Sequence, residues 1–318
     1  MAMDDVHFVS VIEDNTFLSW QQELQLYNFQ QLGIAASLWI VILYTGDAPN
    51  ECVSLLRQRH SQRTLCFRNE QPEHIVTAYR AVNKPWGISR LLRYNPSLGN
   101  KLYSIDSDVW LKRPIDFTDI LKDSNWYGSC CNTYLNAKHW LQDKKISRQD
   151  LERVCGIAGV TLQQFETVND CSIGAQLLFK NVTWQFFAAV AEDSWRINDA
   201  LRQLHDRGTE NQHWVAEMLS FLLHMLRVKG QNGLKMHPEF NFAWATTESN
   251  ESYDQCNIVH MAGATQRDGP YFFKGRYETV TPWCNLDDLA HATATGASAD
   301  YKALIYAYRQ WSSINKIN

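Results

Sequence analysis

The sequence predicts an α/β fold in which a mixed sheet is flanked by helices. Over the first 105 residues, apolar segments typical of strands alternate with segments that have helical periodicity. We expect strands at residues 7–12, 37–44, 64–67 and 101–105, and helices at residues 17–31, 51–59 and 86–94. Strands and helices that alternate in this way favour a sheet with helices on both faces.

Two segments support this interpretation most directly. Residues 37–44 (SLWIVILY) are almost continuously apolar, which is typical of a strand buried on both faces of a parallel sheet. Residues 17–31 place leucines and phenylalanines among glutamines and a glutamate, and Gly33 follows where a C-cap glycine would end a helix. Ligands in such folds bind beyond the carboxyl ends of the strands, so residues that directly follow strands are candidates for function.

The second half of the chain has a more mixed pattern. We expect a strand at 174–180, helices at 182–205 and 211–228, an irregular region with short strands at 231–285, and a last helix at 298–311. No repeat and no Gly/Ser/Pro-rich linker divides the chain. We therefore expect one domain over residues 1–318, with halves of about 1–114 and 115–318, the second carrying a C-terminal mixed elaboration.

The composition excludes several classes of protein. With 45% hydrophobic and 20% charged residues, the 318-residue chain can bury a large core, which excludes intrinsic disorder as its overall state. A formal charge of −4 excludes a strongly basic nucleic-acid binder, although arginines and lysines cluster within residues 57–68 and 80–93. The 8 cysteines include no C-x-x-C pair, so we expect reduced thiols of a cytosolic protein.

The N-terminal sequence and the apolar stretches predict the location. The acidic start, MAMDDVHFVSVIEDN, lacks the basic residues and apolar run of a signal peptide. The longest apolar stretch, residues 34–44, has about half of the roughly 20 residues that cross a bilayer. We therefore expect a cytoplasmic protein with no membrane partner.

Residues 101–114 (KLYSIDSDVWLKRP) carry the clearest chemical signal. An apolar strand leads into Asp106-Ser107-Asp108, and in an extended backbone the two carboxylates project to the same side. Carboxylates so close repel each other unless a cation lies between them, so the pair suits a hard divalent ion such as Mn²⁺ or Mg²⁺. Such an ion keeps positions for the phosphates of a nucleotide diphosphate and neutralises the charge that develops as the diphosphate leaves. An ordinary polar loop is the alternative.

This segment resembles the D-x-D motif of GT-A-fold glycosyltransferases, which use nucleotide sugars. Residues 9–21 (VSVIEDNTFLSWQ), 81–92 (AVNKPWGISRLL) and 214–218 (WVAEM) are similar to stretches of plant hydroxyproline O-arabinosyltransferases and peptidyl-serine galactosyltransferases. The resemblance implies a GT-A-like, Rossmann-type mixed sheet, a UDP-sugar donor and transfer with retention of configuration. It favours arabinose over galactose or glucose, and it implies a nucleotide-sugar-binding first half and an acceptor-binding second half.

The resemblance also implies which residues bind the nucleotide sugar. They are Ile12, Glu13, Asp14, Asn83, Lys84, Arg90, Asp106, Ser107, Gly174, Gly263, Lys274 and Arg276. The residues at the end of the first strand would receive the base and ribose, and the cations would lie near the diphosphate. Asp14 or Asn15 could instead be the N-cap of the next helix. Lys84 and Arg90 could instead be ordinary cations on the solvated surface.

A third metal ligand is implied by the same resemblance. His260 follows a short apolar strand, where many GT-A enzymes have a histidine that binds the metal, and a glycine-containing basic loop comes next. Imidazole with two carboxylates is a plausible set for Mn²⁺. The expected metal ligands are therefore Asp106, Asp108 and His260, although a lone histidine is more often structural.

Glu217 is the first of two candidates for catalysis. In the expected helix 211–228 it shares a face with His213, and it forms a stripe with Trp214 and Phe221. A carboxylate among aromatic rings has a raised pKa, so Glu217 could take a proton or orient an acceptor hydroxyl. The alternative is a glutamate at the edge of an ordinary amphipathic helix.

Asp170 is the second candidate, through the resemblance alone. It begins residues 170–179 (DCSIGAQLLF), which resemble the GT-A segment in which a small turn precedes a strand beside the donor sugar. Within this segment Gly174 would permit the backbone and the sugar to approach closely. A plain turn before a strand is the alternative.

Two classes of acceptor remain open at this stage. A cytoplasmic location favours DNA with 5-hydroxymethylated pyrimidines, which some bacteriophages glycosylate inside the bacterial host, and we expect this acceptor first. The family resemblance favours a hydroxyl of a peptide, on hydroxyproline or serine. A non-catalytic carbohydrate- or nucleotide-binding module is the alternative of another class, although binding alone seldom needs a carboxylate pair.

Overall fold

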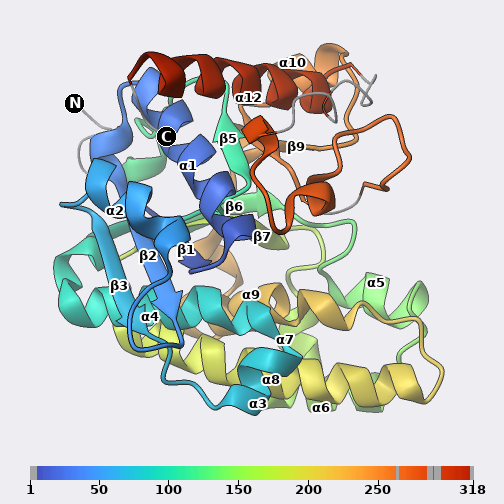
Figure 1. The fold of residues 1–318 in the computed structure, drawn as a ribbon. Helices are drawn as coiled ribbons and strands as arrows, with labels where there is room; N and C mark the ends of the chain where they lie inside the picture. The colour runs from blue at the N-terminus through green and yellow to red at the C-terminus, as the bar shows by residue number, and fades with distance from the viewer. Residues whose placement is uncertain (1–5, 263–264, 285–288, 290–294, 316–318) are drawn as a thin grey trace.

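The computed structural model describes residues 6–262, 265–284, 289 and 295–315, and a seven-stranded mixed sheet lies at its centre (Figure 1). Its strands are β1 (His7–Glu13), β2 (Leu38–Tyr44), β3 (Thr64–Arg68), β4 (Lys101–Ser104), β6 (Trp126–Cys130), β7 (Ile173–Lys180) and β8 (Leu234–Met236). They lie in the order β3-β2-β1-β4-β7-β6-β8. Strands β1 to β4 run parallel, whereas β7 is antiparallel to both of its neighbours. The predicted fold class, an α/β fold with a mixed sheet flanked by helices, is confirmed.

Helices cover both faces of this sheet. They are α1 (Thr16–Gln31), α2 (Ser54–Arg59), α3 (Glu73–Ala78), α4 (Asn83–Tyr94), α5 (Ala137–Gln142), α6 (Arg148–Ile157), α7 (Leu162–Glu166), α8 (Trp184–Asp206), α9 (Ala216–Lys229), α10 (Glu251–Gln255) and α12 (Ala297–Ile314). In Figure 1, α1 and α12 lie above the sheet, and α4, α8 and α9 lie below it. Phe8 of β1 belongs to the core under α1, and its neighbour Val9 belongs to the core over α4, as the alternation of a strand requires.

A second, three-stranded sheet brings the end of the chain back to the middle. Its strands are β5 (Val109–Leu111), β10 (Ile258–His260) and β9 (Phe242–Trp244), in the order β5-β10-β9. Strand β10 is antiparallel to β5 and parallel to β9. Because β5 follows directly after β4, this small sheet joins the C-terminal third of the chain to the carboxyl end of a central strand.

Helix α1 is buried on more sides than the sequence pattern predicts. Gln21, Gln22, Glu23 and Gln25 are buried as well as Leu24 and Leu26, whereas Gln31 at the end of the helix is exposed. The reason is that α12 packs on the outer side, where Tyr308 of α12 contacts Tyr27 at a ring-centroid distance of 5.5 Å. Several of the buried polar groups have partners within the protein, as in the hydrogen bond that Trp20 Nε1 donates to the Tyr277 carbonyl (2.9 Å), whereas Gln21 Oε1 and Gln22 Oε1 accept none.

The structure differs from the sequence-based expectations at several elements. The predicted helix 211–228 begins only at Ala216, and His213–Val215 before it form a 3₁₀ turn. Strands β5 and β6 and helices α3, α5 and α7 lie outside the predicted elements, because each is short. Helix α6 also lies outside them, although Leu151, Val154 and Cys155 give it an apolar face at helical spacing. Within the described residues, no helix is both long enough and apolar enough to cross a membrane.

Candidate metal centre

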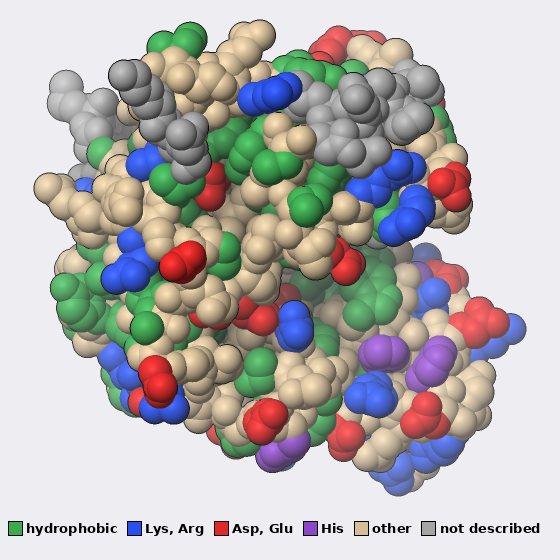
Figure 2. All heavy atoms as spheres, in the orientation of Figure 1, with side chains coloured by type: hydrophobic (Ala, Val, Ile, Leu, Met, Phe, Trp, Pro, Cys, Tyr) green, Lys and Arg blue, Asp and Glu red, His purple; other side chains and the backbone are tan. Residues whose placement is uncertain are grey.

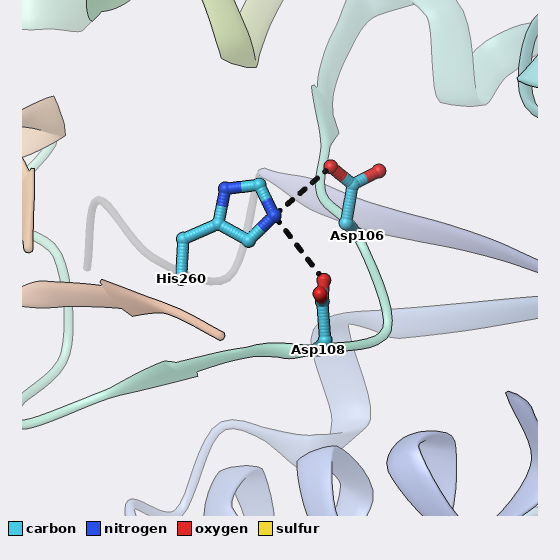
Figure 3. A group of neighbouring side chains, drawn as sticks. All are labelled: Asp106, Asp108 and His260. Atoms are coloured by element: carbon cyan, nitrogen blue, oxygen red, sulfur yellow. Dashed lines mark ion pairs between the residues drawn. The ribbon is translucent and has the colours of Figure 1, made fainter. Parts of the chain in front are cut away.

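Three of the predicted residues meet at the carboxyl end of β4. Asp106, Asp108 and His260 each offer a ligand atom, and these atoms all lie within 4.8 Å of one another. His260 Nε2 lies 3.3 Å from Asp108 Oδ1 and 3.7 Å from Asp106 Oδ2, and in Figure 3 the imidazole points between the two carboxylates. The Asp108 side chain is 9% exposed and the His260 side chain 11%, whereas Asp106 is 31% exposed. The structure therefore brings together the three expected metal ligands, although their role as ligands stays a prediction.

The two sheets explain how these residues meet. Asp106 follows the end of β4, and the backbone turns there into β5, which begins one residue after Asp108. The register of the small sheet pairs His260 with Val109, and the Met261 amide donates a hydrogen bond to the Asp108 carbonyl (2.9 Å). His260 is therefore carried to the D-x-D turn by backbone pairing rather than by a flexible loop.

Two amides of α1 hold this turn from beneath. Gln25 Nε2 donates hydrogen bonds to the carbonyls of Asp106 (2.7 Å) and Val109 (2.8 Å). One turn later, Asn28 exchanges a pair of hydrogen bonds with the backbone of Leu111 in β5, both at 3.0 Å. Both amide side chains are buried, so they replace a neighbouring strand as partners of the turn and of β5.

A third amide side chain, from β7, lies beside His260. Gln176 of β7 is fully buried, and its Nε2 lies 3.4 Å from His260 Nδ1, while its Oε1 accepts a hydrogen bond from Ser129 (2.6 Å). The residue before it, Ala175, has a φ of 54°, at an irregularity in the β6–β7 pairing. Left-handed backbone costs roughly 1–2 kcal/mol in a residue with a Cβ, so the surrounding structure must impose this conformation. The other side of the imidazole is fixed by Trp244, whose ring is stacked on it at 5.8 Å.

Each carboxylate of the D-x-D turn also has a lysine. Lys84, in the first turn of α4, places its Nζ 2.8 Å from Asp106 Oδ1, and Lys274 Nζ donates a hydrogen bond to Asp108 Oδ2. Burial alone would raise the pKa of Asp108, but Lys274 and His260 outweigh burial and hold that pKa below its ordinary value. For Lys84 burial lowers the pKa, yet the neighbouring carboxylates outweigh it and the net pKa is raised. Both ion pairs are therefore formed at neutral pH.

Glu217 extends the group beyond Lys84. It is buried in the first turn of α9, and its Oε1 lies 3.6 Å from Lys84 Nζ without accepting a hydrogen bond. Burial raises the pKa of Glu217, Lys84 offsets part of this rise, and Asp106 adds to it. The Glu217 amide donates to Tyr79 Oη (2.7 Å), which in turn donates to the Trp214 carbonyl (2.9 Å).

The predicted surroundings of Glu217 are wrong in part. Because α9 begins only at Ala216, His213 and Glu217 do not share a face of one α-helix. Trp214 is 61% exposed, whereas Phe221 is buried in the core, so these two rings form no stripe with the carboxylate. Burial, not an aromatic stripe, is what raises the pKa of Glu217.

The donor set fits a divalent cation. Two carboxylates and an imidazole, with ligand atoms at this spacing and partly open to solvent, suit Mn²⁺, and the carboxylates alone suit Mg²⁺. Next to this set, the buried Glu217 Oε1 accepts no hydrogen bond from a described residue, as an oxygen that faces a further polar or cationic group would. The residues present therefore fit the metal that the sequence predicts.

Several residues predicted to bind the nucleotide sugar surround the centre at a greater distance or pair elsewhere. Glu13 accepts a hydrogen bond from Asn83 Nδ2 (3.0 Å) at the carboxyl end of β1. Asp14 accepts one from the Asn50 amide (3.0 Å), while Asn15 is the N-cap of α1. Burial is the main cause of the raised pKa of Asp14. Their roles toward a nucleotide stay predictions.

Other predicted residues have partners that account for their positions. Arg90 forms an ion pair with Glu70 (2.9 Å), and Arg276 donates to the Arg267 carbonyl rather than to the D-x-D carboxylates. The Ile12 side chain lies in the core, and Ser107 is buried within the turn. Asp170 is exposed in the turn before β7. None of these observations tests a role in binding or catalysis.

Gly174 lies in the core of the protein. A Cβ added to Gly174 would meet Cys131 Sγ and Met218 Cε, each at 3.0 Å, so packing alone explains a glycine there. Its predicted approach to the donor sugar stays untested. Gly263, also predicted to bind the nucleotide sugar, lies outside the described residues.

Four residues around the centre were not singled out from the sequence. They are Gln25, Gln176, Tyr79 and Trp244, which hold the turn, the imidazole and the start of α9. A glutamine within the apolar segment IGAQLLF was a detectable signal, because a buried amide in a strand needs partners. The other three have no pattern that separates them from ordinary core and surface residues.

Comparisons with known proteins give likeness of fold only. No protein-family model and no curated protein sequence matches the chain. Among solved structures, an active-site mutant of LgtC is similar over 95% of this chain and 96% of its own, at 12% identity and a TM-score of 0.46. The galactosyltransferase LgtC in complex with donor and acceptor sugar analogues aligns with 94% of this chain and along its own full length (100%), at 11% identity and a TM-score of 0.39. Mouse xyloside xylosyltransferase 1, in its apo form, aligns with 82% of this chain and with 99% of its own, at 11% identity and a TM-score of 0.41. At TM-scores below 0.5, function has to be argued from the site itself.

Proposed function

We propose that this protein is a metal-dependent glycosyltransferase of the GT-A type, which transfers a sugar from a UDP-sugar to a hydroxyl acceptor. One observation carries the proposal: Asp106, Asp108 and His260 converge directly after a central strand, with a lysine beside each carboxylate. This is the combination that an anionic leaving group needs, because cations on both sides of it can share its charge.

In this proposal, separate residues bind the metal, stabilise the leaving group and orient the substrate. Asp106, Asp108 and His260 would hold Mn²⁺ or Mg²⁺, which supplies Lewis-acid stabilisation of the leaving diphosphate. Lys274 and Lys84 add two positive charges on either side of the carboxylates, and they can offset charge as the bond from sugar to diphosphate breaks. Glu217, which is buried with its Oε1 3.6 Å from Lys84 Nζ, would orient Lys84 or a hydroxyl of the sugar.

We propose transfer with retention of configuration, and arabinose as the favoured sugar, with galactose and glucose next. The resemblance of residues 81–92 and 214–218 to plant arabinosyl- and galactosyltransferases supports this choice. In such a reaction the bond between C1 and the diphosphate breaks, and a bond from C1 to the acceptor oxygen forms. The acceptor proton passes to an oxygen of the leaving phosphate, so the reaction requires no protein base. Asp170 and Glu217 would then position substrate.

For the acceptor we propose a 5-hydroxymethylated pyrimidine of phage DNA, which would place the enzyme in the cytoplasm of a bacterial host. Arginines of the two basic clusters, within residues 57–68 and 80–93, are partly engaged inside the protein: Arg59 lies over Trp311 (4.4 Å), Arg93 over Trp184 (3.8 Å), and Arg90 pairs with Glu70. A peptide hydroxyl, on hydroxyproline or serine, is the alternative, and the resemblance to plant enzymes supports it.

A donor screen tests the proposal. Thermal unfolding is followed with Mn²⁺ and UDP-arabinose, UDP-galactose, UDP-glucose or UDP, and a ligand at 100 times its Kd adds about 2.7 kcal/mol. Hydrolysis of the best donor, stopped by EDTA, separates an enzyme from a binding module, which would bind without turnover. A chain that responds to none of these ligands would not be a UDP-sugar transferase.

The acceptor is then sought with the best donor. Hydroxymethylated DNA, unmodified DNA, and hydroxyproline- and serine-containing peptides are incubated in parallel. DNA digested to nucleosides shows a modified hydroxymethylcytosine or hydroxymethyluracil if the DNA proposal holds. Transfer to a peptide alone would replace it with the alternative.

A further inference from the structure

The two carboxylates of the candidate metal centre are already neutralised by the protein. Asp106 directs Oδ1 to Lys84 Nζ (2.8 Å) and Oδ2 toward His260, and Asp108 directs Oδ2 to Lys274 and Oδ1 toward His260 (3.3 Å). The lysine side chains are only 15% and 16% exposed, so water screens these ion pairs poorly. Each carboxylate thus offers one oxygen to an ammonium and keeps the other for the centre.

The balance of charge follows from these contacts. The carboxylates of Asp106, Asp108 and Glu217 and the ammoniums of Lys84 and Lys274 leave one net negative charge when His260 is neutral. A free divalent cation would change this to a net positive charge, with two ammoniums close to the ion. In a buried site such repulsion is strong. A nucleotide diphosphate brings negative charge on each phosphate, and this compensates both the metal and the lysines.

We infer that Lys84 and Lys274 suppress the binding of free metal, so that the metal and a nucleoside diphosphate bind as one unit. The inference rests on the proposed function, since it specifies how the donor and the metal enter that same site. The lysines hold the carboxylates in place before the ligand arrives, and they turn to the diphosphate when it binds. The coupling is reciprocal: UDP increases the affinity for the metal by the same factor as the metal increases the affinity for UDP.

Replacement of Lys274 should change the affinities for free Mn²⁺ and for UDP in opposite directions, which would not happen if Lys274 only stabilised the fold. In Lys274→Met, one positive charge beside the centre is removed, so Mn²⁺ alone binds about tenfold more tightly than in the natural chain, or about 1.4 kcal/mol. The same variant binds UDP in the presence of Mn²⁺ more weakly, because the diphosphate has lost a cation. A general weakening of the fold would instead lower both affinities.

Calorimetric titration tests the inference. Mn²⁺ is titrated into the natural chain, Lys274→Met, Lys84→Met and Lys274→Arg, with and without UDP. Lys274→Arg keeps the positive charge, so it is expected to bind free Mn²⁺ as weakly as the natural chain does. Lys122→Met is the matched control, because Lys122 pairs with Asp119 on the exposed surface. Unfolding of each variant, followed with and without Mn²⁺, shows that it is folded and that the metal stabilises Lys274→Met more than the natural chain.

The outcomes distinguish the two proposals. The inference is wrong if both methionine variants bind Mn²⁺ no more tightly than the natural chain does. It is also wrong if the affinity for Mn²⁺ is the same with and without UDP. If UDP binds to no variant even with Mn²⁺, the proposed function fails. The effect of the lysines on the metal alone is then still decided by the titrations without nucleotide.

Discussion

Replacement of Glu23 by glutamine should change how the stability of the protein depends on pH. Glu23 of α1 is 4% exposed and accepts a hydrogen bond from Tyr308 of α12 (2.6 Å), which itself accepts one from Arg59 (3.0 Å). Burial raises the pKa of Glu23 from 4.5 to about 7, although the Tyr308 hydroxyl and Arg59 counteract it. The folded protein therefore retains the proton over a range in which the unfolded chain has lost it.

The size and sign of the effect follow by linkage. Because the folded state binds the proton more tightly, stability falls as the pH rises from 4.5 to about 7, and it is fully retained below 4.5. At 1.36 kcal/mol per pKa unit, the loss is about 3 kcal/mol above pH 7. Glu23→Gln keeps an acceptor for Tyr308 but cannot ionise. The variant is thus expected to equal the natural chain at about pH 4 and to exceed it by about 3 kcal/mol at about pH 8.

Urea unfolding at a series of pH values, followed by tryptophan fluorescence, measures this difference. Other carboxylates affect both chains alike, so only the gap between the two curves is interpreted. Tyr308→Phe is a useful companion, because removal of the donated hydrogen bond raises the pKa of Glu23 further, so the fall in stability still begins near pH 4.5 but extends to higher pH. Parallel curves for Glu23→Gln and the natural chain between pH 4.5 and 8 would refute the reasoning.

Three further predictions concern packing and the metal centre. Gly87→Ala in α4 should destabilise the fold by about 1–3 kcal/mol, because the added Cβ would lie 2.5 Å from a methyl group of Val11. Gly156→Ala in α6, where nothing lies within 4 Å, should instead add about 0.5–1 kcal/mol, and equal thermal shifts for the two variants would contradict this contrast. Asp108→Asn should weaken binding of Mn²⁺ with UDP by more than about 100-fold, and full transfer in EDTA would show that the site needs no metal. Gln176→Leu should weaken Mn²⁺ binding by about 10–100-fold with an unchanged far-UV circular dichroism spectrum. If the variant binds Mn²⁺ as tightly as the natural chain does, the Gln176 amide does not support the metal centre.

The central strands and the D-x-D turn could be predicted because their signals are local. Residues 37–44 are apolar without a break, and β2 covers Leu38–Tyr44. Likewise, Asp106 and Asp108 lie two positions apart at the end of a strand, so their proximity is fixed by the backbone. In both cases a few consecutive residues contain the information.

The remainder of the site depends on contacts between distant segments. Glu23 of α1 is buried against Tyr308 of α12, and Gln25 is buried under the D-x-D turn, so contacts with distant segments and not the local pattern decide their burial. The 3₁₀ turn before α9 shows the same limit, because a helical spacing of His213 and Glu217 does not reveal where regular helix begins. The pairing of Lys274 with Asp108 joins two residues with no common motif.

The wide spread of these residues along the chain has a consequence for biosynthesis. The pair of Lys274 and Asp108 spans 166 positions, and His260 also comes from the C-terminal segment. Contacts over such separations form late, because the closure of long loops is entropically unfavourable. On the ribosome, which delivers the chain N-terminus first, Asp106 and Asp108 emerge well before their partners. A partly synthesised chain therefore carries the two carboxylates before His260 and Lys274, which complete the cluster, have been made.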